Sequence, residues 1–238
     1  MTEFRPGRFE ILPVIIKNLL IINGLFFLAQ ITFPESPTAI FSLEDLFALH
    51  AWQSELFKPW QLVTHLFMHG DFYHILGNMF ALWMFGSVLE NLWGSARFLT
   101  FYLVCGLGAA LIHLIFLSYE LTPLIQEFQT REKLGIMNEA IAYKYYQIIN
   151  TATLGASGAV FGILAAFVYL FPNTYIYLYF FVPVKAKWVG LVYFGFELYS
   201  AVQNAAGDNV ARWAHVGGAL VGLIIVITWN KTNKKTFY

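Results

Sequence analysis

Three short groups of residues in this chain carry the side chains that nucleophilic chemistry needs. Ser157 lies within Gly-Ala-Ser-Gly at 155–158, His215 lies two residues before a pair of glycines, and His74 and Asn78 are four residues apart. A histidine that removes the proton of a serine hydroxyl makes that hydroxyl a nucleophile. Acyl transfer also needs donors for the developing oxyanion, which backbone N–H groups or histidine and asparagine side chains can supply. The residue types therefore indicate acyl transfer through a serine, provided that the fold brings the groups together.

The composition places these residues in a membrane protein. Of 238 residues, 58% are hydrophobic and 12% are charged, whereas soluble domains carry about a quarter charged residues. The formal net charge is zero and no basic run is present, so we expect no nucleic-acid partner. A single cysteine excludes a disulfide framework and a zinc site built from several thiolates. We therefore expect the lipid bilayer to be the main environment of the chain.

Six apolar stretches approach the roughly 20 residues that a helix needs to cross about 30 Å of hydrocarbon. They are residues 14–33, 66–89, 98–119, 151–171, 188–206 and 210–229. We therefore expect an all-α membrane protein with a six-helix membrane domain over 14–229 and terminal tails at 1–13 and 230–238. In the loop 120–150 apolar residues recur at helical spacing, which predicts a surface helix resting on the lipid headgroups.

The distribution of lysine and arginine predicts the orientation. Most of the 14 basic residues fall at the two ends of the chain and in the connections between spans two and three and between spans four and five. With six spans these segments share one side, and an excess of basic residues marks the cytoplasmic side. We expect an integral, multi-pass protein of a bacterial inner membrane, with both termini in the cytoplasm.

The same topology puts the three chemical groups at one depth. Spans two, four and six all run from the outer to the inner side. At about 1.5 Å per residue, Ser157, His215 and the pair His74 and Asn78 all fall on the order of 10 Å below the outer surface. Polar groups at such a depth are costly, so each is a functional candidate.

Small residues can bring two of these spans into contact. Gly158 and Gly162 are four apart on the fourth span, and Gly218 and Gly222 are four apart on the sixth. This spacing lets helix backbones approach closely. Each pair begins within three residues of a polar partner, so close packing would set the serine hydroxyl beside the imidazole.

The geometry of this layer predicts a two-residue catalytic unit. The backbone N–H of Ser157 lies at the start of a helix, where the positive end of the dipole favours an oxyanion, and Asn78 and His74 offer side-chain donors. No carboxylate matches a third member at this depth, so we expect a dyad of Ser157 and His215. Glu197 in the fifth span is either a packing partner near the cavity or part of a substrate gate, and we favour the packing role.

These residues together resemble the rhomboid family of intramembrane serine proteases over nearly the whole chain. The resemblance rests on the histidine-rich entry to the second span at 65–69 and 74–78, on Gly-x-Ser-Gly at 155–158, on Ala214-His215 with Gly218 and Gly222, and on Glu90 followed by Gly94.

The resemblance implies roles for individual residues. Ser157 would be the nucleophile and His215 the general base, and the oxyanion site would consist of His74, Asn78 and the Ser157 amide. The supporting positions are Gly155, Gly158, Phe161, Gly218 and Gly222. It also implies a six-helix bundle with a water-filled cavity open to the outer side, and transmembrane proteins as substrates. We expect no metal and no organic cofactor.

Two positions depart from the family pattern. The first outer loop has Gln61 where family members commonly have arginine after the tryptophan, so the usual arginine contacts are missing. The position four residues after the serine is Phe161, where tyrosine is often found. A phenyl ring there can still stack on the imidazole of His215, but it lacks the hydroxyl.

Other interpretations remain open at the level of sequence. A catalytically silent rhomboid-like binder of membrane proteins would typically lack the serine or the histidine, and this chain keeps both. A small transporter that uses the histidines as a proton path is a third possibility, but inverted repeats are not evident. His65, His69 and His74 are close in sequence, yet no His-Glu-x-x-His pattern or acidic ligand accompanies them, so we favour structural hydrogen bonds over zinc.

Overall fold

The computed structural model describes residues 9–33, 42–178, 181–203 and 211–232. The long helices are α1 (Val14–Thr32), α6 (Ser95–Lys133), α8 (Ser157–Leu170), α9 (Ala186–Gln203) and α10 (Arg212–Thr232). A further helix is formed by α4 (Phe72–Ala81), one π-helical turn η2 (Leu82–Gly86) and α5 (Ser87–Trp93). The prediction of an all-α fold is confirmed. Most of the two predicted tails, residues 1–8 and 233–238, lies outside the described residues.

Four helical segments are long and apolar enough to cross a membrane, namely α1, Phe72–Trp93, α6 and α10. They correspond to the first, second, third and sixth predicted spans. The fifth, α9, contains Lys187 and Glu197 within its 18 residues and is not among the four. The fourth, α8, is apolar but has 14 residues, about 21 Å at 1.5 Å per residue. Residues 158–167 of α8 are all buried, so protein rather than lipid surrounds this short helix.

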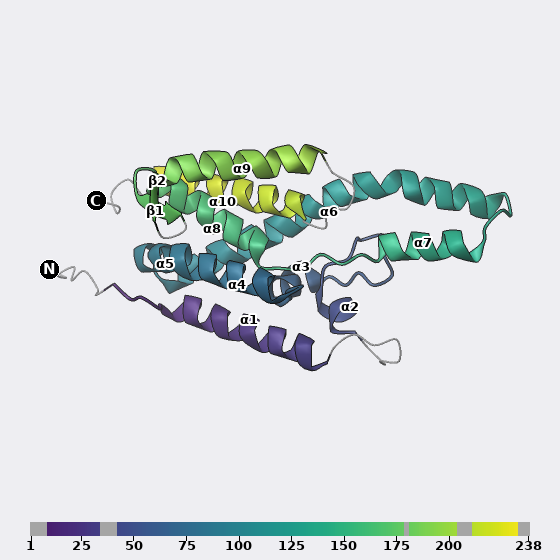
Figure 1. The fold of residues 1–238 in the computed structure, drawn as a ribbon, viewed down its shortest axis with the longest axis horizontal. Helices are drawn as coiled ribbons and strands as arrows, with labels where there is room; N and C mark the ends of the chain where they lie inside the picture. The colour runs from purple at the N-terminus through teal and green to yellow at the C-terminus, as the bar shows by residue number, and fades with distance from the viewer. Residues whose placement is uncertain (1–8, 34–41, 179–180, 204–210, 233–238) are drawn as a thin grey trace.

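The helices form one bundle around α8. Figure 1 shows α1 along one edge of the bundle and α9 along the opposite edge, with α4, α8 and α10 between them. An antiparallel pair of strands, β1 (Tyr175–Leu178) and β2 (Val182–Lys185), connects α8 to α9. It lies at the end of the bundle where α1 begins, whereas α2 (Leu43–Phe47), α3 (Gln61–Thr64) and the 3₁₀ turn η1 (His65–Phe67) lie at the other end, here called the loop end.

The two predicted glycine rows face each other across α8 and α10. A Cβ atom on Gly218 would overlap the carbonyl oxygen of Gly158, and one on Gly222 would lie 2.6 Å from the carbonyl oxygen of Gly162. Real Cβ atoms essentially never come that near an oxygen. The backbones of the two helices are therefore in direct contact, as small residues four apart allow.

Glu90 joins three helices at the end opposite the loop end. Its carboxylate is buried and accepts hydrogen bonds from the backbone N–H groups of Ile15 and Ile16, both at 2.9 Å, and from the hydroxyl of Ser95 at 2.7 Å. The first N–H groups of a helix have no partner within the helix. Pro13 precedes α1 without a capping side chain, so Glu90 caps α1 from a neighbouring helix.

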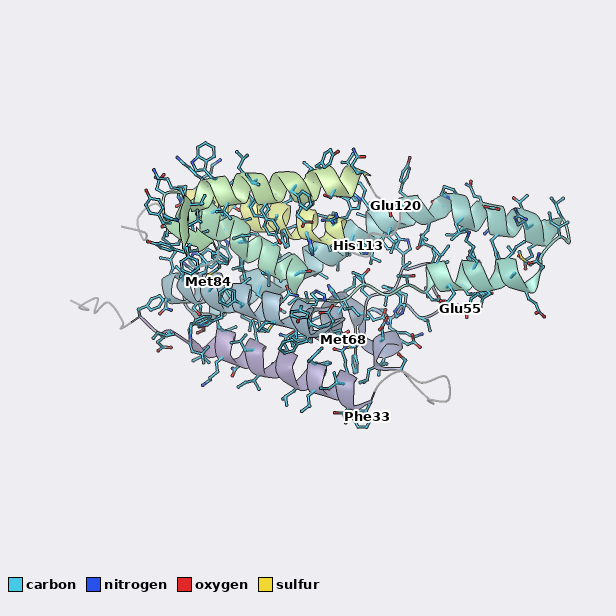
Figure 2. All side chains as sticks on the ribbon, in the orientation of Figure 1. Phe33, Glu55, Met68, Met84, His113 and Glu120 are labelled. Atoms are coloured by element: carbon cyan, nitrogen blue, oxygen red, sulfur yellow. The ribbon has the colours of Figure 1, made fainter. Side chains whose placement is uncertain are left out.

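The helix α6 continues well beyond the predicted end of the third span at residue 119. It extends to Lys133, and α7 (Glu139–Ile149) runs back beside it, so the two form an arm that projects past the loop end (Figure 1). The rings of Phe128 and Tyr145 stack at 3.9 Å and hold the arm together. Figure 2 shows His113 and Glu120 near the point where α6 leaves the bundle. The predicted helix within 120–150 therefore pairs with α6; its place on the headgroups stays a prediction.

The glycine contact predicts that Gly218→Ala destabilises the protein. The methyl group would push α10 away from the α8 backbone, and overpacking of this kind costs about 1–3 kcal/mol. At about 2–4 °C of melting temperature per kcal/mol for a chain of this size, the loss is measurable by thermal unfolding in detergent. Gly195→Ala in α9 is the matched control because nothing lies within 4 Å of its Cβ position. Equal melting temperatures for the two variants would contradict the close helix contact.

Candidate active site

Ser157 and His215 form a hydrogen bond between the starts of two helices. Ser157 is the first residue of α8 and His215 lies in the first turn of α10. The Oγ atom of Ser157 lies 2.9 Å from Nε2 of His215, although 58 residues separate them in sequence. The contact between the glycine rows holds the two helix starts at this distance. A serine hydroxyl and an imidazole in this arrangement can exchange a proton.

The turn into α8 depends on Gly155. Its φ angle of 129° lies in the left-handed region of backbone conformation, which residues other than glycine rarely adopt. A Cβ atom at this position would also lie 2.8 Å from Nε2 of His74. Backbone conformation and close approach both require glycine here. As a result, the chain can turn sharply before Ser157 while the ring of His74 packs against it.

Phe161 fixes the plane of the imidazole. Its ring is stacked on the ring of His215, with centroids 4.2 Å apart and planes 9° from parallel. The ring of Phe161 also stacks on that of Tyr193 of α9, with centroids 5.1 Å apart. The stacking predicted for the phenyl ring is present. Because the two rings are parallel, the phenyl ring hinders rotation of the imidazole out of its plane.

The far side of the imidazole contacts a carboxylate that the sequence analysis did not place there. Nδ1 of His215 lies 3.0 Å from Oε2 of Glu197 on α9, and a guanidinium nitrogen of Arg212 lies 3.4 Å from the same oxygen. Glu197 is 5% exposed. The expectation that no carboxylate lies at this depth was wrong. Glu197 is a charged residue in an otherwise apolar segment that precedes α10 and runs in the opposite direction. That placement was the signal in the sequence from which a contact between Glu197 and His215 could have been inferred.

His74 and Asn78 lie on one face of α4 beside Ser157. Asp71 caps this helix by accepting a hydrogen bond from the backbone N–H of His74 at 2.9 Å. The N–H of Gly70 donates to Nδ1 of His74 at 3.3 Å, so a neutral imidazole carries its proton on Nε2. The buried Nδ2 of Asn78 has no hydrogen-bond partner within the described part of the chain. Both residues therefore present N–H groups that a ligand could use.

A cavity of about 920 Å³ connects these groups. Its polar part contains Ser157, His215, His74 and Asn78, and its apolar part continues along α4, η2 and α8. Residues of the loop end, including Gly70 and Asp71, also line it. A polypeptide segment entering from the loop end or from between the helices could thus reach the serine hydroxyl.

Gln61 organises the loop end at the position where an arginine was expected from the resemblance. Its fully buried amide oxygen accepts from the backbone N–H groups of His50 and Lys58 at 3.3 and 3.1 Å, and its amide nitrogen donates to two carbonyl groups of the same loop. A neutral amide therefore performs a loop-holding role through four hydrogen bonds.

His65 and His113 anchor the segment that leads into Ser157. Nδ1 of His65 contacts the carbonyl of Gln61 at 2.8 Å, and the carbonyl of His65 accepts from the N–H of Gly155 at 2.9 Å. Nε2 of His113 lies 2.8 Å from the hydroxyl of Thr153. Burial lowers the pKa of His65 to about 4, so it is neutral near pH 7. In the described residues no group of three or more metal-ligating side chains is assembled.

Several curated proteins are similar to this chain. RHOMBOID-like protein 12, mitochondrial, of Arabidopsis thaliana is 31% identical over 74% of the chain, and Rhomboid protein 1, mitochondrial, of Saccharomyces cerevisiae is 31% identical over 68% of it. Rhomboid protease AarA of Providencia stuartii is 26% identical over 89% of the chain and 71% of its own length. The chain spans 47% and 40% of the two mitochondrial relatives, which is about half their length or less.

The expectation of a bacterial inner membrane was wrong. Four relatives, including the two above, are mitochondrial by name, and they point to a mitochondrial membrane. The cytoplasmic placement of both termini is withdrawn with it. The positions of lysine and arginine indicate on which side of a membrane each loop lies. They do not indicate in which membrane of the cell the protein is located. The multi-pass membrane character is supported by the four helices that could span a bilayer.

The family is given by the match to a family model. The model of the Rhomboid domain matches residues 56–231, a segment that contains α3 to α9, all but the last residue of α10, and the side chains of Ser157, His215, His74, Asn78 and Glu197. The relatives that are 31% identical each align with more than two thirds of the chain. The chain therefore belongs to the rhomboid family.

Proposed function

We propose that this chain is an intramembrane serine endopeptidase whose membrane domain extends over residues 14–229. Ser157 is the nucleophile and His215 the general base. His74, Asn78 and the backbone N–H of Ser157 bind the oxyanion. Membership of the rhomboid family, and similarity to proteins named as rhomboid proteases, support a protease.

The observation that carries this proposal is the 2.9 Å contact between Ser157 and His215 inside a cavity whose wall also holds the amide nitrogen of Asn78, which has no hydrogen-bond partner among the described residues. A buried amide without a partner is costly in a protein interior. Nδ2 of Asn78 is such a group, and it lies on the wall of the cavity that holds the hydroxyl. A site that binds a negatively charged oxygen next to the nucleophile accounts for both features.

The proposed reaction proceeds through an acyl-enzyme. Oγ of Ser157 attacks the carbonyl carbon of the scissile bond while its proton moves to Nε2 of His215. The carbonyl oxygen becomes an oxyanion, which accepts hydrogen bonds from Asn78, His74 and the Ser157 amide. The imidazolium then protonates the leaving nitrogen, and the C–N bond breaks. Water, deprotonated by His215, attacks the ester carbonyl; the bond between the acyl carbon and Oγ of Ser157 breaks, His215 returns its proton to Oγ, and the acid is released.

The substrates proposed are transmembrane helices cut near the loop end of the bundle. The site lies among the starts of α4, α8 and α10, which face that end. In a membrane every backbone group of a helix is bonded within the helix. A substrate must therefore unwind locally before its peptide bond reaches Ser157, so segments with glycine, proline or small residues at that depth are preferred.

Replacement of the nucleophile provides the first test. Ser157→Ala should abolish covalent labelling by a fluorophosphonate probe and lower cleavage of a model transmembrane substrate by about 10³-fold or more. The matched control is Ser87→Ala, since Ser87 is a serine of the same bundle that is buried and does not line the cavity. Labelling is read by in-gel fluorescence and cleavage by mass spectrometry of the products.

Two results would contradict the proposal. Labelling that persists in Ser157→Ala would assign the nucleophile elsewhere. A wild-type chain that binds a transmembrane substrate but neither cleaves it nor reacts with the probe would indicate the silent membrane-protein binder instead.

The oxyanion role predicts a specific kinetic effect for Asn78. Asn78→Ala should lower kcat by about 10²-fold, the usual loss of one oxyanion donor, and should leave KM nearly unchanged because the bond forms only as negative charge develops. Asn23→Ala is the control, because Asn23 is also a buried asparagine, donates to the carbonyl of Leu19 in its own helix and does not line the cavity. An Asn78 variant with unchanged kcat would remove this residue from the oxyanion site.

A further inference from the structure

His215 is held by a carboxylate on the side that faces away from Ser157. Oε2 of Glu197 lies 3.0 Å from Nδ1, whereas Nε2 lies 2.9 Å from the serine hydroxyl. The imidazole therefore bridges α9 and α8, with one ring nitrogen directed at each helix. Phe161 covers one ring face at 4.2 Å, so the ring is fixed in position and in plane.

This contact determines which nitrogen carries the proton. An ionised carboxylate accepts hydrogen bonds and cannot donate one. Nδ1 must then be the protonated nitrogen, and in the neutral ring the lone pair is on Nε2. That lone pair faces the hydroxyl of Ser157, which is the state that a general base needs before it removes a proton. Without the carboxylate both tautomers would be available, and one of them cannot act as a base.

The burial of Glu197 is difficult to explain by packing alone. A carboxylate inside a membrane helix is costly and is retained where it has a partner or a function. Arg212 supplies a positive charge, but its guanidinium nitrogen lies 3.4 Å from Oε2 of Glu197. Nδ1 of His215 is closer to the same oxygen, at 3.0 Å. The carboxylate thus remains charge-balanced by Arg212 while it contacts the ring of His215.

We propose that Glu197 is a positioning residue that extends the pair to a Ser157–His215–Glu197 triad, an inference that rests on the proposed function. When the Oγ proton moves to Nε2, His215 becomes a cation. Glu197 stabilises that cation through the Nδ1–H bond and stays unprotonated throughout. The proton on Nε2 then passes to the leaving nitrogen, so the step needs no further reactant. Arg212 keeps the carboxylate in place when the imidazole is neutral.

The experiment compares Glu197→Gln with the wild-type protein in detergent or nanodiscs. We expect kcat per fluorophosphonate-titrated site to fall by about 10⁴-fold, the loss found when an amide replaces the carboxylate of a serine triad. We expect KM for a model transmembrane substrate to change less than about threefold, because Glu197 acts on the proton transfer and not on substrate binding. Titration of active sites removes any contribution from unfolded protein.

Glu90→Gln is the matched control for the loss of a buried carboxylate. Glu90 has three hydrogen-bond donors, is 2% exposed, and lies at the opposite end of the bundle. This variant should melt at a lower temperature and should keep kcat per titrated site. A comparable fall of kcat in both variants would show that any buried carboxylate has this effect, and would overturn the triad.

A double variant separates positioning of His215 from neutralisation of Arg212. If Glu197 serves only to balance the guanidinium, Arg212→Gln combined with Glu197→Gln should restore kcat to near the wild-type value, and the triad is overturned. If Glu197 acts on His215, the double variant stays as slow as Glu197→Gln. Wild-type kcat in Glu197→Gln, with Ser157→Ala inactive, overturns the triad but leaves the proposed function intact. Absence of any Ser157-dependent activity in the wild type overturns both.

Discussion

Two carbonyl oxygens of α8, those of Gly158 and Gly162, lie where side chains of α10 would stand if Gly218 and Gly222 were any other residue. Backbone contact therefore sets the separation of the two helices, with no flexible side chain between them. A hydrogen bond between side chains weakens steeply beyond its normal range of distance. Because Ser157 and His215 lie next to these glycines, the bond between them depends directly on the helix contact.

Two buried carboxylates inside the bundle, Glu90 and Glu197, have partners on other helices. Glu90 caps α1 at one end, and Glu197 contacts His215 and Arg212 nearer the loop end. In the hydrocarbon of a membrane no water is present to form hydrogen bonds with such groups. Each buried charge therefore fixes the relative position of the helices that it joins, and at Glu197 the position that is fixed is that of the proposed general base.

The sequence predicts those parts of the site that depend on spacing along a helix. Residues three or four apart share a helix face, so the glycine rows followed from position alone. The stacking of Phe161 on His215 was expected from the resemblance to the rhomboid family. Glu197 did not, because its depth relative to His215 depends on the connection between α9 and α10 and on how the helices pack. The length of α6 was also missed, since charged residues after Tyr119 indicate where a helix leaves the membrane rather than where it ends.

A structure of the protein in lipid nanodiscs after reaction with a fluorophosphonate tests the account most directly. We expect a covalent bond to Oγ of Ser157, an oxygen of the adduct within hydrogen-bond distance of Asn78, and Glu197 still hydrogen-bonded to Nδ1 of His215. Modification of any other residue, or a separation of Ser157 and His215 beyond hydrogen-bond range in the unreacted protein, would contradict it.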